Sequence, residues 1–139
     1  MAKFKFLEHT ADAKFQAYGN SMEEAFSNAA LAMFSIITDT KKINKNIKKE
    51  IEIEGKDLKS LLYNFLEELL FLLDTENFLL NKIEKISIKK TREKYSLNAA
   101  VIGDKADDYE TSGDIKAVTY NEMEIEENDK VMVQVVVDI

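Results

Sequence analysis

The sequence predicts an α+β fold, a two-layer sandwich in which two main helices cover one face of a mostly antiparallel or mixed sheet. Segments with apolar residues at every second position outnumber segments with apolar residues at three- and four-residue spacing. Short polar turns separate neighbouring strand segments, which is typical of antiparallel connections. The chain has 139 residues, the length of one domain, so we expect residues 1–139 to share one core.

The N-terminal part predicts one strand and one helix. Residues 13–18 alternate between apolar and polar side chains, which indicates a strand with one buried face, and a Gly-Asn turn follows. Ser21 followed by Glu24 is the pattern of a capping box, because the serine hydroxyl can accept from the amide of the third helical residue. We expect this helix to extend to about Thr38, with one apolar stripe toward the core.

The middle of the chain predicts a second strand followed by a second helix. Isoleucines alternate with lysine and glutamate up to residue 54, and Gly55 ends the strand. Asp57 can cap a helix that extends to about Thr75. The apolar surface of this helix is unusually wide and includes Leu58, Leu61, Leu62, Phe65, Leu66, Leu69, Leu70, Leu72 and Leu73. We expect it to be buried against the sheet or shared with a partner.

Four further strands are predicted in the second half, at residues 78–90, 95–102, 118–125 and 130–138. The last two form a hairpin around the turn at residues 126–129. Four valines at alternate positions from Val131 to Val137 indicate one face of the final strand. The polar and acidic segment 103–113 is expected to be an exposed loop.

Charge and composition exclude several classes of function. Nineteen Lys and Arg residues face 26 Asp and Glu residues, and the net charge of −7 repels a polyanion, so strong direct nucleic-acid binding is not expected. The absence of cysteine excludes thiol catalysis and thiolate metal sites. Because no apolar run reaches the roughly 20 residues that cross a bilayer, and no secretory signal is recognisable, we expect a cytoplasmic protein without membrane contact.

Three short segments carry side chains suited to chemistry, at residues 8–12, 116–120 and 137–139. Singly, each is weak, because Asp12 could be a turn or capping residue, Asp138 a solvated end residue, and His9 a hydrogen-bonded structural histidine. Together, Asp12, Asp138 and the terminal carboxylate of Ile139 offer only oxygen ligands, which suit Ca²⁺, Mg²⁺ or Mn²⁺. This grouping requires the first predicted strand to begin beside the end of the last one. Lys116 is a candidate ammonium group for balancing the charge of these carboxylates.

These segments resemble the archease family, whose members assist the RtcB-type RNA ligase in tRNA splicing and RNA repair. The resemblance extends over nearly the whole chain: His-Thr-Ala-Asp ends at Asp12, two helices follow in order, Lys-Ala-Val-Thr-Tyr begins at Lys116, and Asp-Ile ends the sequence. It implies an α/β sandwich and a protein that promotes guanylylation of the ligase. Repeated turnover and broader nucleotide use by the ligase are the implied results.

The resemblance also implies roles for individual residues. The family's metal site corresponds to Asp12, Asp138 and the terminal carboxylate of Ile139, with Ca²⁺ as the first expectation and Mg²⁺ or Mn²⁺ as alternatives. Asp12 and Lys116 match the family's essential aspartate and lysine, which activate the ligase and perform no independent catalysis. One departure is Asn121, because the family often has histidine there; asparagine can keep a hydrogen bond but not an imidazole role.

Two other functions are considered from the residues. A chaperone-like adaptor would bind its partners through the leucine face of the second helix. A small hydrolase would use His9 and Asp12, but no residue context that activates a nucleophile is recognisable. A glycine-rich loop for phosphate or dinucleotide binding is also missing from the sequence.

Overall fold

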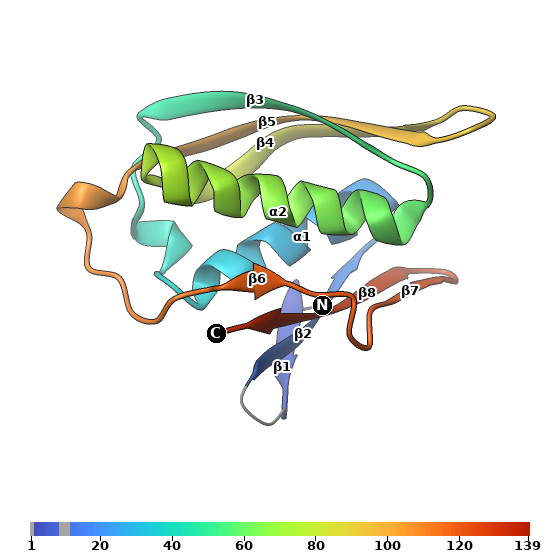
Figure 1. Ribbon diagram of the computed structural model, residues 1–139, viewed down its shortest axis with the longest axis horizontal. Helices are drawn as coiled ribbons and strands as arrows, with labels where there is room; N and C mark the ends of the chain where they lie inside the picture. The colour runs from blue at the N-terminus through green and yellow to red at the C-terminus, as the bar shows by residue number, and fades with distance from the viewer. Residues whose placement is uncertain (1, 9–11) are drawn as a thin grey trace.

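The computed structural model describes residues 2–8 and 12–139, which form two antiparallel sheets and two long helices (Figure 1). Sheet A contains β1 (Phe4–Leu7), β2 (Asp12–Gly19), β8 (Val131–Asp138), β6 (Ala117–Val118) and β7 (Glu124–Glu127). Sheet B contains β3 (Ile47–Gly55), β5 (Tyr95–Lys105) and β4 (Phe78–Lys90). The helices are α1 (Met22–Ser35) and α2 (Leu58–Glu76), with short 3₁₀ turns η1 (Thr40–Lys42) and η2 (Ala106–Asp108).

The two long helices lie between the sheets. Helix α1 contacts β2 and β8 on one side and β4 on the other, and α2 contacts β3 and β5 as well as β6. Figure 1 shows sheet B above the helices and sheet A below them. The predicted α+β class, with antiparallel pairing and two main helices, is confirmed. The strands divide between two sheets, and each sheet carries the helices on one face, which explains why α2 needs such a wide apolar surface.

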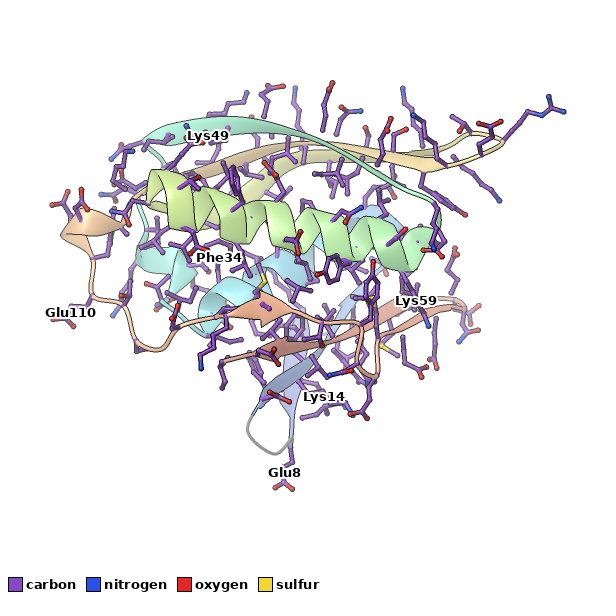
Figure 2. The ribbon with its side chains drawn as sticks, viewed as in Figure 1. Glu8, Lys14, Phe34, Lys49, Lys59 and Glu110 are labelled. Atoms are coloured by element: carbon purple, nitrogen blue, oxygen red, sulfur yellow. The ribbon has the colours of Figure 1, made fainter. Side chains whose placement is uncertain are left out.

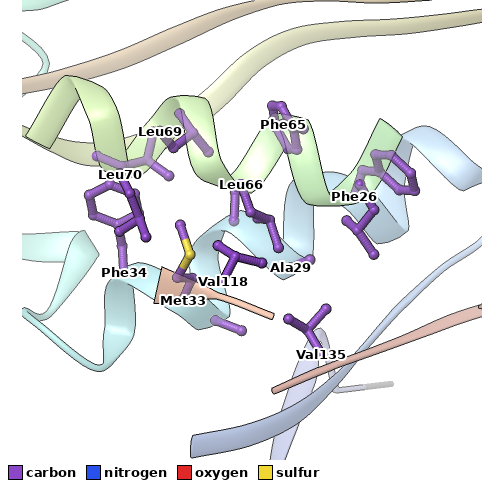
Figure 3. Close-up of a cluster of buried hydrophobic side chains, with 14 of the residues drawn as sticks. Phe26, Ala29, Met33, Phe34, Phe65, Leu66, Leu69, Leu70, Val118 and Val135 are labelled. Atoms are coloured by element: carbon purple, nitrogen blue, oxygen red, sulfur yellow. The ribbon is translucent and has the colours of Figure 1, made fainter. Parts of the chain in front are cut away.

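The hydrophobic core fills the space between the sheets. Phe26 of α1 and Phe65 of α2 stack with ring centroids 6.2 Å apart. In Figure 3, side chains of both helices meet Val118 of β6 and Val135 of β8. The buried residues of α2 are Leu61, Leu62, Phe65, Leu66, Leu69, Leu70 and Leu72. Most of the leucine face of this helix is therefore occupied by the chain's own core, which leaves little of it for the partner that the adaptor hypothesis requires.

The predicted start of the first helix is confirmed. The Ser21 hydroxyl accepts from the Glu24 amide at 3.1 Å, and the Glu24 carboxylate accepts from the Asn20 amide at 2.8 Å. Both bonds satisfy amides at the helix start that have no partner within the helix. Helix α1 ends at Ser35, three residues before the predicted end at Thr38.

The predicted start of the second helix is also confirmed. The Asp57 carboxylate accepts from the Ser60 amide at 2.8 Å, and the Asp57 amide donates to the Ser60 hydroxyl at 3.1 Å, which completes a capping box. The helix ends at Glu76, and the next residue, Asn77, has a φ of 56°, the left-handed conformation common after helix ends. No described helix combines the length and apolarity required to cross a lipid bilayer.

The strand predictions differ from the structure mainly in sheet A. The short strand β1 was not predicted, and the segment expected as one strand at residues 118–125 forms the two strands β6 and β7, which both pair with β8. Five residues separate Val118 from Glu124, whereas two separate their partners Val137 and Gln134, so the chain loops away from β8 between them. Within this loop Glu122 has a φ of 51°.

Strand β5 extends three residues beyond its predicted end and includes the first part of the predicted loop at 103–113. This extension is possible because residue 103 is glycine. A Cβ atom there would lie 1.9 Å from the carbonyl oxygen of Leu79, at a position where the partner strand β4 is irregular. The lack of a side chain therefore allows close approach of two strands at this point.

Candidate functional site

Strand pairing brings the N-terminal and C-terminal segments together at one end of sheet A. Strands β2 and β8 are antiparallel, with Asp12 opposite Asp138. Strand β6 pairs on the other side of β8, with Ala117 opposite Asp138. The Lys116 amide donates to the Asp138 carbonyl oxygen at 2.8 Å. The predicted meeting of the first clear strand with the end of the last one is thus confirmed, and Lys116 lies beside it.

Asp12 and Asp138 present their side chains on the same face of sheet A. Directly opposed residues of antiparallel strands point to one side, with Cβ atoms about 4.5–5.5 Å apart. The next pair, Ala13 and Val137, points the opposite way, toward the helices, and Val137 is fully buried. Both aspartates are partly exposed on the outer face. Because like charges directly opposite each other repel, this position favours a nearby cation.

Two further predicted residues complete this end of the sheet. Ile139 directly follows Asp138, so its Cα atom lies about 3.8 Å from the Cα atom of Asp138. Its side chain is exposed. Lys116 is also exposed, and within residues 2–8 and 12–139 its ammonium group has no ion-pair partner. The ammonium group is therefore available to a ligand or a partner protein.

The donor set of this end fits a hard cation in type. Among the described residues, no group of three or more His, Asp or Glu side chains is placed to hold a metal ion. The structure brings together two side-chain carboxylates, Asp12 and Asp138, so the backbone carboxylate of Ile139 would have to contribute a further ligand. All of these donors are oxygens, the type preferred by Ca²⁺ and Mg²⁺. His9 lies outside the described residues, so the hydrolase hypothesis, which depends on His9, is not tested by the structure.

The segment that begins at Lys116 is attached to both β8 and α2. The Thr119 hydroxyl donates to the Val136 carbonyl oxygen at 2.8 Å and accepts from the Asn121 amide at 3.2 Å. Tyr120 stacks on Tyr63 of α2, with ring centroids 4.3 Å apart and an interplanar angle of 7°. These contacts hold the segment from two sides. Asn121 lies exposed in the following turn.

The two stacked tyrosines lie in an acidic environment. A hydrogen bond to the Glu67 carboxylate, assisted by partial burial, raises the pKa of Tyr63 above its usual value of 10.0. Burial and then the charges of Asp57 and Glu67 raise the pKa of Tyr120. Both phenols are therefore neutral at physiological pH. Tyr63 was not among the predicted site residues, although a polar aromatic residue among the leucines of α2 was a signal that could have indicated it.

A polar network on the outer face of sheet A was also missed. Gln16 donates to the Gln134 side-chain oxygen at 2.9 Å, and Gln134 donates to the Glu122 carbonyl oxygen at 2.8 Å. Lys14, labelled in Figure 2, pairs with the Glu122 carboxylate at 3.1 Å. The network holds the turn that follows Tyr120. Polar residues at alternate positions of both strands were visible in the sequence, but their register was not.

Comparison with known proteins gives one consistent result. The family model for the archease protein family matches residues 4–139. The chain is 45% identical to the protein archease of Methanosarcina barkeri over 142 residues, which cover 99% of this chain and 96% of that protein. It is 43% identical to the protein archease of Pyrococcus abyssi over 143 residues, with 100% of both chains covered.

A solved structure has the same architecture. The solution structure of Methanobacterium thermoautotrophicum protein 1598 superimposes with a TM-score of 0.86 and 37% sequence identity, and the match covers 100% of each chain. The similarity therefore includes both sheets and both helices.

Proposed function

The chain belongs to the archease family, and from this premise we propose that it activates an RtcB-type RNA ligase. In this proposal it promotes guanylylation of the ligase and allows multiple turnover in tRNA splicing and RNA repair. The protein acts as an activator of another enzyme and not as an enzyme itself. The observation that supports the proposal most directly is the meeting of Asp12, Asp138 and Lys116 at one end of sheet A.

Asp12, Asp138 and the backbone carboxylate of Ile139 would hold a divalent cation, with Ca²⁺ foremost and Mg²⁺ or Mn²⁺ as alternatives. When bound, the cation would offset the repulsion of the opposed carboxylates and supply positive charge near a nucleotide phosphate. Lys116 is exposed and directly precedes β6, the strand that pairs with Asp138, so its ammonium group can contact a phosphate oxygen in the ligase. An ammonium group in that position would offset phosphate charge during nucleotidyl transfer.

The net charge supports action through a protein partner. A charge of −7 disfavours strong direct binding of RNA, whereas it steers the protein toward a basic surface on the ligase. A cytoplasmic location belongs to the same proposal. The adaptor alternative is less well supported, because the leucine face of α2 is buried between the two sheets.

The test is multiple-turnover RNA ligation by a cognate ligase, with and without the protein. Wild type should stimulate turnover, and Lys116→Ala should remove the stimulation. Lys45→Ala is the control and should retain it, because Lys45 is also an exposed lysine but lies after η1, outside the strand-end site. Circular dichroism melting should be the same for all three proteins. No stimulation by wild type under any nucleotide condition would overturn the proposed function. Unchanged stimulation with Lys116→Ala would remove only this lysine from the mechanism.

A further inference from the structure

A second surface, distinct from the strand-end site of sheet A, lies between α2 and sheet B. Helix α2 and strands β3 and β5 border a hollow of about 660 Å³. We call this hollow the α2–β3 groove. Figure 1 shows α2 running beneath β3 along this side of the molecule. The groove therefore belongs to the other sheet, and its occupation would leave Asp12 and Lys116 accessible.

The α2–β3 groove is strongly acidic. Its lining includes Glu52 and Glu54 of β3 together with Glu67 and Glu68 of α2, and it includes no lysine or arginine. Lys94 pairs with Glu54 at one end. In the described part of the chain, Glu52 and Glu68 have no ion-pair partner. Glu67 accepts a hydrogen bond from Tyr63, so Glu52 and Glu68 are the two groove carboxylates most available to a cationic partner.

An exposed aromatic ring lies in the same groove. Phe71 of α2 is 55% exposed, although the neighbouring turns of the helix are packed into the core. Ile53, which also lines the groove, is only partly buried and contributes further apolar surface. An apolar side chain of a partner can therefore be buried against Phe71, and flanking cations can contact both the glutamates and the ring face.

We propose that the α2–β3 groove docks a lysine- or arginine-rich segment of the partner ligase that carries one apolar anchor residue. This proposal rests on the proposed function, which supplies the identity of the partner. Charge selects the occupant. A lining with four glutamates and no lysine or arginine disfavours RNA, and a second copy of a chain with a net charge of −7 would be repelled. A basic protein segment is attracted by the glutamates and retained by the apolar floor.

The first test reverses charge in the groove and compares it with a matched change elsewhere. Glu52→Lys combined with Glu68→Lys should weaken binding to the ligase at least about tenfold in titration calorimetry at physiological ionic strength. Asp108→Lys combined with Glu110→Lys, two exposed residues near η2, makes the same change in net charge and should weaken binding less than about threefold. Equal effects of the two pairs would overturn the groove as the docking site.

The second test identifies the occupant with a photo-crosslinking phenylalanine derivative placed at Phe71. The same label at Asn128, exposed beyond β7, is the control. Selective cross-linking from Phe71 to a Lys- or Arg-rich segment of the ligase supports the proposal. Cross-linking to RNA or to a second copy overturns it.

The two proposals fail in different ways. One outcome is that wild type stimulates the ligase, while the charge reversal in the groove does not weaken binding and the label at Phe71 does not cross-link to the ligase. In that case the docking proposal is wrong and the proposed function stands. If wild type neither stimulates nor binds the ligase, the proposed function is wrong, and the ligase segment is excluded as the occupant.

Discussion

Sheet A and sheet B are assembled from the chain in opposite ways. Sheet B uses three strands within residues 47–105, and two of them, β4 and β5, form a hairpin. Sheet A joins β1 and β2 from the start of the chain to β6, β7 and β8 from its end, so that residues 12–19 pair with residues 131–138. The comparison shows that the candidate site depends on pairing between the two ends of the chain, whereas the neighbouring sheet is assembled within one continuous segment.

The two regions also differ in burial. Phe65, Leu66 and Leu69 of α2 are fully buried between the sheets. At the strand end of sheet A, Asp12 and Asp138 are partly exposed and Lys116 is exposed. We therefore expect substitutions in the core to lower stability, and substitutions at the strand end to remove activity with little change in stability.

The largest expected effect is on activity. Extending the chain beyond Ile139 by three residues should move the backbone carboxylate away from Asp12 and Asp138, lower Ca²⁺ affinity at least about tenfold, and remove ligase stimulation. The free energy of unfolding should change by less than about 1 kcal/mol. Ile139→Val keeps the carboxylate and is the control. Calcium calorimetry and ligation assays give the readout, and retained Ca²⁺ binding by the extended protein would contradict the metal assignment.

The largest expected effect on stability is in the core. Phe65→Ala should lower the free energy of unfolding by about 3–5 kcal/mol, because a fully buried ring that stacks on Phe26 is removed. Phe71→Ala, on the same helix but 55% exposed, should cost no more than about 0.5 kcal/mol. Urea unfolding measures both. Similar losses would show that the division between the buried and exposed faces of α2 is wrong.

A smaller loss is expected where β4 and β5 approach closely. Gly103→Ala would place a methyl group 1.9 Å from the Leu79 carbonyl oxygen, so the strands must separate. We expect a cost of about 1–3 kcal/mol in urea unfolding and faster amide exchange along β4. Asn98→Ala, an exposed position on the same strand, serves as the control. Equal stability of Gly103→Ala and wild type would mean that this approach is looser than the structure indicates.

Helix capping should have a still smaller effect that depends on pH. The hydrogen bonds from the Ser60 amide and hydroxyl lower the pKa of Asp57 from its usual value of 3.8. A folded-state pKa below the unfolded value stabilises the protein above pH 3.8, and this contribution is lost as the pH falls through the folded pKa. Asp57→Ala should cost about 1 kcal/mol near neutral pH, and less in acid.

The uncharged cap of α1 is the control for this pH dependence. Ser21→Ala removes a hydroxyl that accepts from the Glu24 amide, so its cost should vary less between neutral pH and pH below 3.8. Urea unfolding at the two pH values measures the difference. A cost for Asp57→Ala that is constant with pH would exclude the charged cap as its source.

The smallest expected effect is a difference in coupling energy between two ion pairs, one beside each sheet. The Lys14 side chain is 16% exposed in its pair with Glu122, whereas Lys94 is 47% exposed in its pair with Glu54. The Lys14–Glu122 coupling should be about 0.5–1 kcal/mol, and the Lys94–Glu54 coupling below about 0.5 kcal/mol and lost at high salt. Double-mutant cycles measure both couplings. The reverse order would contradict the role of burial.

Elements governed by neighbouring residues were predictable. Ser21 and Asp57 begin the two helices as expected, because a helix cap is formed by hydrogen bonds within three residues. Strand β4 begins and ends at the predicted residues. Alternating apolar and polar side chains indicate a strand with one buried face. Strand β1 was missed because its four residues are too few to establish a period.

The sequence by itself determined the α+β class, the helix starts, most of the strands and the identity of the candidate residues, the last with the help of a family resemblance. Only the tertiary structure decided the division into two sheets, the separation of β6 from β7, and the register that sets Asp12 opposite Asp138. The reason is physical: capping and alternation depend on residues a few positions apart, whereas strand register depends on which distant faces are buried together.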